Sequence, residues 1–117
     1  MEAFELAELL TDQQHSGRMY LEFLRVASLS MGLYVLPAGG TDPQQPHSED
    51  EVYYIARGKG QIFVGGENRP VTAGSVVFVA AGVEHRFHSI EDELQIFVFF
   101  APAEYANTSD HFAKGQA

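Results

Sequence analysis

The spacing of apolar residues along the chain changes near residue 18. Before that point, two acids stand close to the start of a run with helical spacing, where negative charge favours a helix. The run consists of Phe4, Leu6, Ala7 and Leu10. This pattern predicts one short N-terminal helix, which the polar segment Thr11 to Gly17 is expected to end.

From Arg18 onward the chain contains short runs rich in β-branched and aromatic residues, which predict strands separated by turns. The expected strands are Met19 to Val26, Leu29 to Leu36, Val52 to Arg57, Gln61 to Val64, Ser75 to Val79, His85 to Ile90 and Leu94 to Phe100. Glycines and acids punctuate them, and Gly58-Lys59-Gly60 is expected to form a hairpin turn. Strands of this number and length indicate an all-β sandwich or barrel.

The last predicted strand, Leu94 to Phe100, is apolar on both of its faces. One face must meet the core, and two explanations are open for the other. Either it forms the interface of a homodimer, or the N-terminal helix covers it within one chain.

The length and charge of the chain limit its organisation and partners. A chain of 117 residues has room for a single domain, residues 1–117, with an extension at 1–17 and a loose tail at 107–117. Sixteen acidic and seven basic residues give a net charge of −9, which disfavours nucleic acid and anionic membrane surfaces. Without a signal peptide or an apolar span of about 18 residues, a cytoplasmic location is expected.

Four side chains form a candidate metal site. In extended chain, Gln45, His47 and Glu51 share one face, since alternate residues point the same way. His85 supplies a second imidazole. Two imidazoles and one carboxylate suit a divalent transition metal and match the composition of non-haem iron sites. Gln45 adds a neutral carbonyl oxygen.

Two stretches of the chain resemble the conserved motifs of the cupin superfamily. The first runs Gly39-x5-Gln45-x-His47-x3-Glu51-x6-Gly58, and the second runs Gly74-x5-Ala80-x-Gly82-x2-His85-x3-Ser89. Their spacing is that of the cupin pattern, with Gln45 in the place of the first histidine. The stretch DPQQPHSEDEVYYIARGKG followed by VTAGSVVFVAAGVEHRFHSI resembles small single-domain bacterial cupins of the conserved-barrel type.

The resemblance implies a double-stranded β-helix, that is, a jelly-roll barrel, with motif 1 at 39–58 and motif 2 at 74–89. It also implies that Gln45, His47, Glu51 and His85 hold iron, manganese, nickel or zinc. Gln45 can be a weak fourth ligand, an amide that orients substrate, or a sign of a site losing its metal. We favour the first, because the other three ligands are present.

Other side chains have simpler explanations or supporting roles. Tyr53, Phe63, Phe87 and Phe97 lie on predicted strands and are candidates to line an apolar pocket beside the metal. The acids from Asp42 to Glu51 and from Glu91 to Glu93 are expected to form a solvated rim, with Glu49 an exposed acid at the mouth of the barrel. His88 is expected on the opposite face from His85.

Three hypotheses for function follow. The first is a metal-dependent enzyme acting on a small organic molecule, as a dioxygenase with iron or as an isomerase or lyase with a Lewis-acidic metal. The second is a non-catalytic module that binds or senses a small molecule. The third is a purely structural metal, which a glutamine in place of a strong ligand disfavours.

Overall fold

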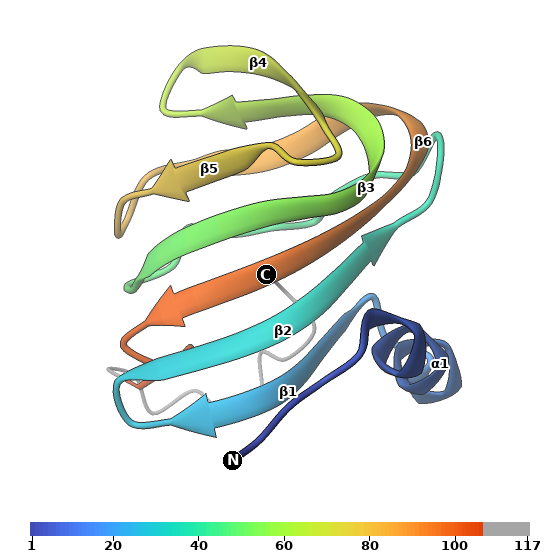
Figure 1. Cartoon of the computed structure of the whole chain (residues 1–117). Coiled ribbons are helices and arrows are strands. Elements are labelled where there is room, and N and C mark those ends of the chain that lie inside the picture. Colours follow the sequence, from blue (N-terminus) through green and yellow to red (C-terminus); the bar gives the residue numbers. More distant parts are fainter. Residues whose placement is uncertain (107–117) are drawn as a thin grey trace.

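One helix lies beside a strongly curved antiparallel sheet in the computed structural model, which describes residues 1–106 (Figure 1). The elements are α1 (Leu6–Ser16), β1 (Tyr20–Val26), β2 (Leu29–Leu36), β3 (Asp50–Val64), β4 (Glu67–Thr72), β5 (Val76–Val79) and β6 (His85–Ala101). The predicted tail at 107–117 lies outside the described residues.

Helix α1 is longer than the sequence pattern predicts. The segment expected to end it is helical as far as Ser16, and the helix ends at Gly17, whose φ of 69° lies in the left-handed region. The prediction was wrong because polar side chains do not by themselves break a helix. Gln13 is instead buried, and its amide donates a 2.7 Å hydrogen bond to the Arg18 carbonyl oxygen.

Strands β3 and β6 each join two of the strands that the sequence predicts. Gly58-Lys59-Gly60 does not form a hairpin turn but lies within β3, and Glu91 to Glu93 lies within β6. The two strands pair along their lengths, with register shifts between Ile55 and Gln61. These irregularities bend both strands together, because extra residues on one strand of a pair increase its local twist.

The sheet has the order β1-β2-β6-β3-β4, and β5 pairs with the first part of β3. Strand β4 was not predicted, because its sequence ENRPVT is polar, contains Pro70 and buries only Val71. Such a strand fits the edge of a sheet, where proline removes no ladder hydrogen bond.

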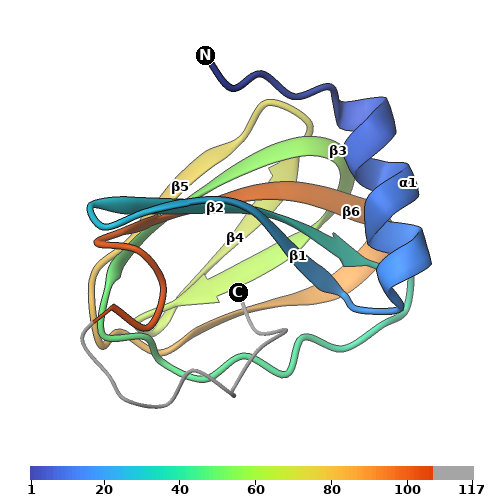
Figure 2. The ribbon, with the colours of Figure 1, turned by 90° about the horizontal axis from the view of Figure 1, so that it is seen from below.

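The curved sheet encloses an interior. Alternate residues of β2, β3 and β6 point inward and form the core: Tyr34, Leu36, Tyr53, Ile55, Ile62, Phe87, Leu94, Ile96, Val98 and Phe100. The loop from β2 to β3 runs beneath the sheet, on the side opposite the viewer of Figure 1 (Figure 2). No helix in the described part of the chain is long and apolar enough to cross a membrane.

Candidate metal centre

Three side chains from separate parts of the chain meet inside the barrel. His47 lies in the loop before β3, Glu51 is the second residue of β3, and His85 is the first residue of β6. One nitrogen or oxygen atom from each lies within 4.8 Å of the other two. The backbone N–H of Gly82 donates to the His47 carbonyl oxygen at 2.6 Å, which ties the two motif segments together.

The orientation of the His85 ring is defined by its neighbours. Its Nδ1 atom lies 2.8 Å from the Val83 carbonyl oxygen, which only accepts hydrogen bonds, so Nδ1 carries the hydrogen. Nε2 then faces the site and lies 3.0 Å from Glu51 Oε1. Burial lowers the pKa of His85, but the Glu51 carboxylate, the Val83 carbonyl oxygen and the charge of Asp42 together raise it above its ordinary value.

Several buried atoms at this point lack a hydrogen-bond partner within residues 1–106. They include His47 Nε2 and both carboxylate oxygens of Glu51, of which Oε1 is close to His85 Nε2 without the alignment of a hydrogen bond. Burying polar atoms without partners is unfavourable by about 1–3 kcal/mol each, and a missing ion is one explanation for such a group. Imidazole nitrogens and a carboxylate are a donor set that fits a divalent transition metal.

Gln45 differs from these three residues in its exposure. Its side chain is exposed, whereas the preceding Gln44 is half-buried and places Oε1 2.9 Å from His85 Nε2. The alternation used to group Gln45 with His47 assumes a strand, and residues 37–49 do not form one. Gln44 was therefore missed, since the motif spacing carries no information about which residue of an irregular loop turns inward.

The acids of this segment are not the solvated rim that we expected. Asp42, Glu49 and Glu51 are all buried, and Glu49 is only 2% exposed. Asp42 accepts hydrogen bonds from the Tyr34 hydroxyl and from the Phe87 backbone N–H. The expectation failed because hydrophilicity predicts exposure only for a loop on the surface, and this loop runs beneath the sheet.

Glu104 is a further buried acid at the site, and sequence reasoning did not identify it. Its Oε2 atom lies 3.9 Å from His47 Nδ1 and has no hydrogen-bond partner among the described residues. Burial, followed by the charges of Glu22 and Glu51, raises the pKa of Glu104 to about 8. No motif marks this residue, which lies beyond β6 and enters the site only through the tertiary fold.

The four aromatic pocket candidates divide into two groups. Tyr53 and Phe87 are buried near the site, with ring centroids 4.8 Å apart, and the Tyr53 ring lies 6.1 Å from that of His85. Phe63 instead packs beneath the Arg86 guanidinium, 4.7 Å from the ring centroid. Phe97 packs against Phe23 on the outer face of the sheet. The structure therefore brings only Tyr53 and Phe87 to the site.

These features define a class of protein. Residues 32–101 match the family model described as a cupin domain, so the chain belongs to the cupin family. The double-stranded β-helix implied by the resemblance is confirmed by a cupin of Methanocaldococcus jannaschii whose crystal structure has that fold. It aligns with a TM-score of 0.66 at 21% identity, covering 73% of this chain and 80% of that one.

Individual relatives extend the comparison. The uncharacterized protein SCO3923 of Streptomyces coelicolor is 48% identical over 104 residues, which are 89% of this chain and 99% of that protein. The structure of TT1209 from Thermus thermophilus aligns with a TM-score of 0.72 at 23% identity, covering 88% of this chain and 99% of that one. The DMSP lyase DddQ from Ruegeria pomeroyi aligns at 0.64 and 21% identity, covering 75% of this chain and 49% of the lyase.

Proposed function

We propose that this cupin binds a divalent transition metal through His47, Glu51 and His85 and acts as an enzyme on a small organic molecule. The observation that carries the proposal is that His47, Glu51 and His85 each bring one ligand atom within 4.8 Å of the others in a buried site, where His47 Nε2 and both Glu51 oxygens have no hydrogen-bond partner among the described residues. A carboxylate and two neutral imidazoles leave coordination positions open, unlike the four strong ligands of structural zinc.

When bound, iron would supply dioxygen chemistry, and manganese, nickel or zinc would supply Lewis acidity for an isomerase or lyase reaction. The rings of Tyr53 and Phe100 pack beside His85 and His47, Phe87 packs against Tyr53, and together they would exclude water. Burial, followed by the charge of Glu51, raises the pKa of Tyr53 well above its ordinary value, so its hydroxyl keeps its proton.

Glu104 supports turnover over simple binding. Its buried carboxyl lies 3.9 Å from His47 Nδ1, and burial raises its pKa, which makes it a candidate to give or take a proton beside the site. A protein with a similar fold, DddQ, is a lyase, and its likeness to this chain concerns the fold alone. The alternative function remains a module that binds a small molecule without turnover.

Elemental analysis of untagged protein purified without chelator tests the metal site. We expect close to one metal ion per chain in the wild type and almost none in His47→Ala, because the variant loses one of two imidazole ligands. His88→Ala is the matched control, since His88 Nε2 contacts Asn68 Oδ1 at 2.7 Å, outside the triad.

Retention of metal by His88→Ala and its loss from His47→Ala would identify the site. Equal loss from both variants would contradict it. Absence of metal from the wild type, even after incubation with iron(II), manganese, nickel and zinc, would leave a metal-free binding barrel as the better interpretation.

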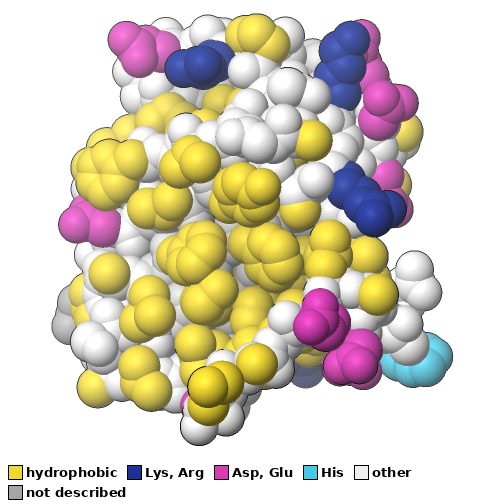
Figure 3. Space-filling model, in the orientation of Figure 1, with side chains coloured by type: hydrophobic (Ala, Val, Ile, Leu, Met, Phe, Trp, Pro, Cys, Tyr) yellow, Lys and Arg dark blue, Asp and Glu magenta, His cyan; other side chains and the backbone are white. Residues whose placement is uncertain are grey.

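We also propose that two copies of the chain associate through the outer face of the sheet. Two rows of apolar side chains cross neighbouring strands in register, Phe78–Val52–Phe99–Met31 and Val76–Tyr54–Phe97. Apolar side chains cover the middle of this face, and the charged ones lie toward its edges (Figure 3). Because each chain carries a charge of −9, contact between two copies is most favourable where charges are absent. The cytoplasmic location stays a prediction from the sequence.

A further inference from the structure

Gln44 is held in one orientation by three neighbours inside the barrel. Its Nε2 atom donates to Asp42 Oδ2 at 2.5 Å, and its Oε1 atom accepts a 2.7 Å hydrogen bond from the Tyr53 hydroxyl. The same Oε1 lies 2.9 Å from His85 Nε2. Both the NH2 group and the carbonyl oxygen of Gln44 therefore have partners, and the carbonyl oxygen points toward the candidate metal centre.

The amide cannot be reversed without losing these contacts. Asp42 Oδ2 also accepts the backbone N–H of Phe87 at 2.8 Å, and the Tyr34 hydroxyl donates to the other oxygen, so both carboxylate oxygens act as acceptors. Only the NH2 group of Gln44 can therefore face Asp42. Its carbonyl oxygen must face His85.

Two oxygen atoms converge on His85 Nε2. With a hydrogen on Nδ1, the ring turns Nε2 toward Gln44 Oε1 at 2.9 Å and Glu51 Oε1 at 3.0 Å. A proton on Nε2 would be shared with these oxygens, and a metal ion in its place would be held by all three atoms. Nitrogen and oxygen donors gathered in this way suit a divalent transition metal.

We infer that Gln44 Oε1 is the fourth protein ligand of the metal, and that Asp42, Tyr34 and Tyr53 are positioning residues that aim it. This inference rests on the proposed function, because it requires a metal bound by His47, Glu51 and His85. It gives the site two nitrogen and two oxygen ligands and a single ligand charge, from Glu51. Replacing an imidazole by an amide oxygen shifts preference toward harder ions such as manganese and away from nickel and zinc.

The adjacent glutamines provide a matched pair for the test. Gln44→Ala removes the proposed ligand, and Gln45→Ala removes the same group from an exposed side chain one residue away. Manganese and nickel dissociation constants, measured by calorimetry on full-length protein, should rise by about tenfold or more in Gln44→Ala. They should change less than about twofold in Gln45→Ala. Gln44→Asn, which keeps the amide but withdraws it by one methylene, should also weaken binding.

Cobalt(II) absorption separates a ligand from a residue that only orients His85. Loss of an oxygen ligand should change the d–d spectrum of cobalt-loaded Gln44→Ala, while Gln45→Ala should match the wild type. Weaker affinity with an unchanged spectrum would overturn the ligand role, as would equal affinities in both alanine variants. If the wild type itself binds no metal, the proposed function and this inference both fail. Unchanged binding in Gln44→Ala overturns only the inference.

Discussion

The Glu104 carboxyl is a buried acid next to a histidine that the proposed metal requires. With its pKa raised to about 8 from an ordinary value of 4.5, the folded protein binds a proton there that the unfolded chain releases in neutral solution. Stability from this group is therefore fully present below about pH 4.5 and is lost as pH rises to about 8. His85, whose pKa is also raised, acts in the same direction.

Glu104→Gln should flatten this pH dependence in chelator-treated protein, because the amide carries no titrating proton. Relative to wild type, we expect the variant to gain roughly 1–3 kcal/mol of stability between pH 5 and pH 8, since each pKa unit corresponds to about 1.4 kcal/mol. Urea unfolding at several pH values measures this difference in the free energy of unfolding. Glu84→Gln, at an exposed acid paired with Arg86, is the control and should follow the wild type. Parallel profiles for Glu104→Gln and the wild type would contradict the expectation.

At the scale of elements, the bend shared by β3 and β6 determines the shape of the barrel. Gly58 lies at this bend with a φ of 106°, and a Cβ atom there would lie 2.1 Å from the Glu93 carbonyl oxygen of β6. Both the backbone angle and the close approach of β6 therefore require glycine. His85 and Glu51 reach one interior because these two strands curve together.

Gly58→Ala should destabilise the protein by roughly 2–4 kcal/mol, because it adds a backbone clash to an unfavourable φ. Gly66→Ala is the control, since Gly66 also has a positive φ of 91° but open space around its Cβ position. For the control we expect a loss of about 1 kcal/mol. Urea denaturation at one pH compares the two, and equal losses would show that the contact with β6 carries no weight.

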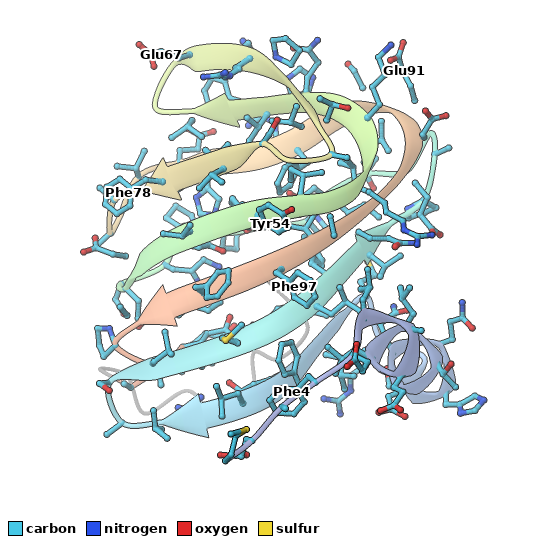
Figure 4. The ribbon with its side chains drawn as sticks, viewed as in Figure 1. Phe4, Tyr54, Glu67, Phe78, Glu91 and Phe97 are labelled. Carbon is cyan, nitrogen blue, oxygen red and sulfur yellow. The ribbon has the colours of Figure 1, made fainter. Side chains whose placement is uncertain are left out.

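The whole molecule presents one face with an unusual concentration of exposed apolar side chains. Phe4, Tyr54, Phe78 and Phe97 all lie on the side toward the viewer in Figure 4. Phe78 is 60% exposed and Val76 is 65% exposed, on a strand of only four residues. Phe4 packs against Phe23, so the N-terminal segment covers one margin of this face and leaves the β5 side open.

Phe78→Glu should convert a dimer of this chain into monomers, because it places a charge inside the proposed interface. Light scattering coupled to size-exclusion chromatography measures the mass, and circular dichroism checks the fold. Ala38→Glu, at an exposed position in the loop after β2, adds the same charge outside the two rows and should leave the dimer intact. A monomeric wild type at micromolar concentration would contradict the proposed assembly.

Much of the fold was predictable from local patterns. The failures arose where the local pattern of a strand differs from that of a typical buried strand. Strands β1 and β2 were expected within one residue of their observed bounds, since apolar and β-branched runs report directly on buried strands. The breaks predicted within β3 and β6 were wrong, because glycines and acids can lie at a bend of a continuous strand. Strand β4 was missed because an edge strand with one buried side chain has no alternating pattern.

The sequence by itself determined the cupin family and pointed to His47, Glu51 and His85, because the spacing of residues within each motif can be read directly along the chain. The tertiary structure alone decided that Gln44 turns inward and Gln45 outward, and that Glu104 lies beside His47. Those positions depend on the path of an irregular loop beneath the sheet and on contacts between residues far apart in the chain. The local sequence pattern predicts neither the path of this loop nor those long-range contacts.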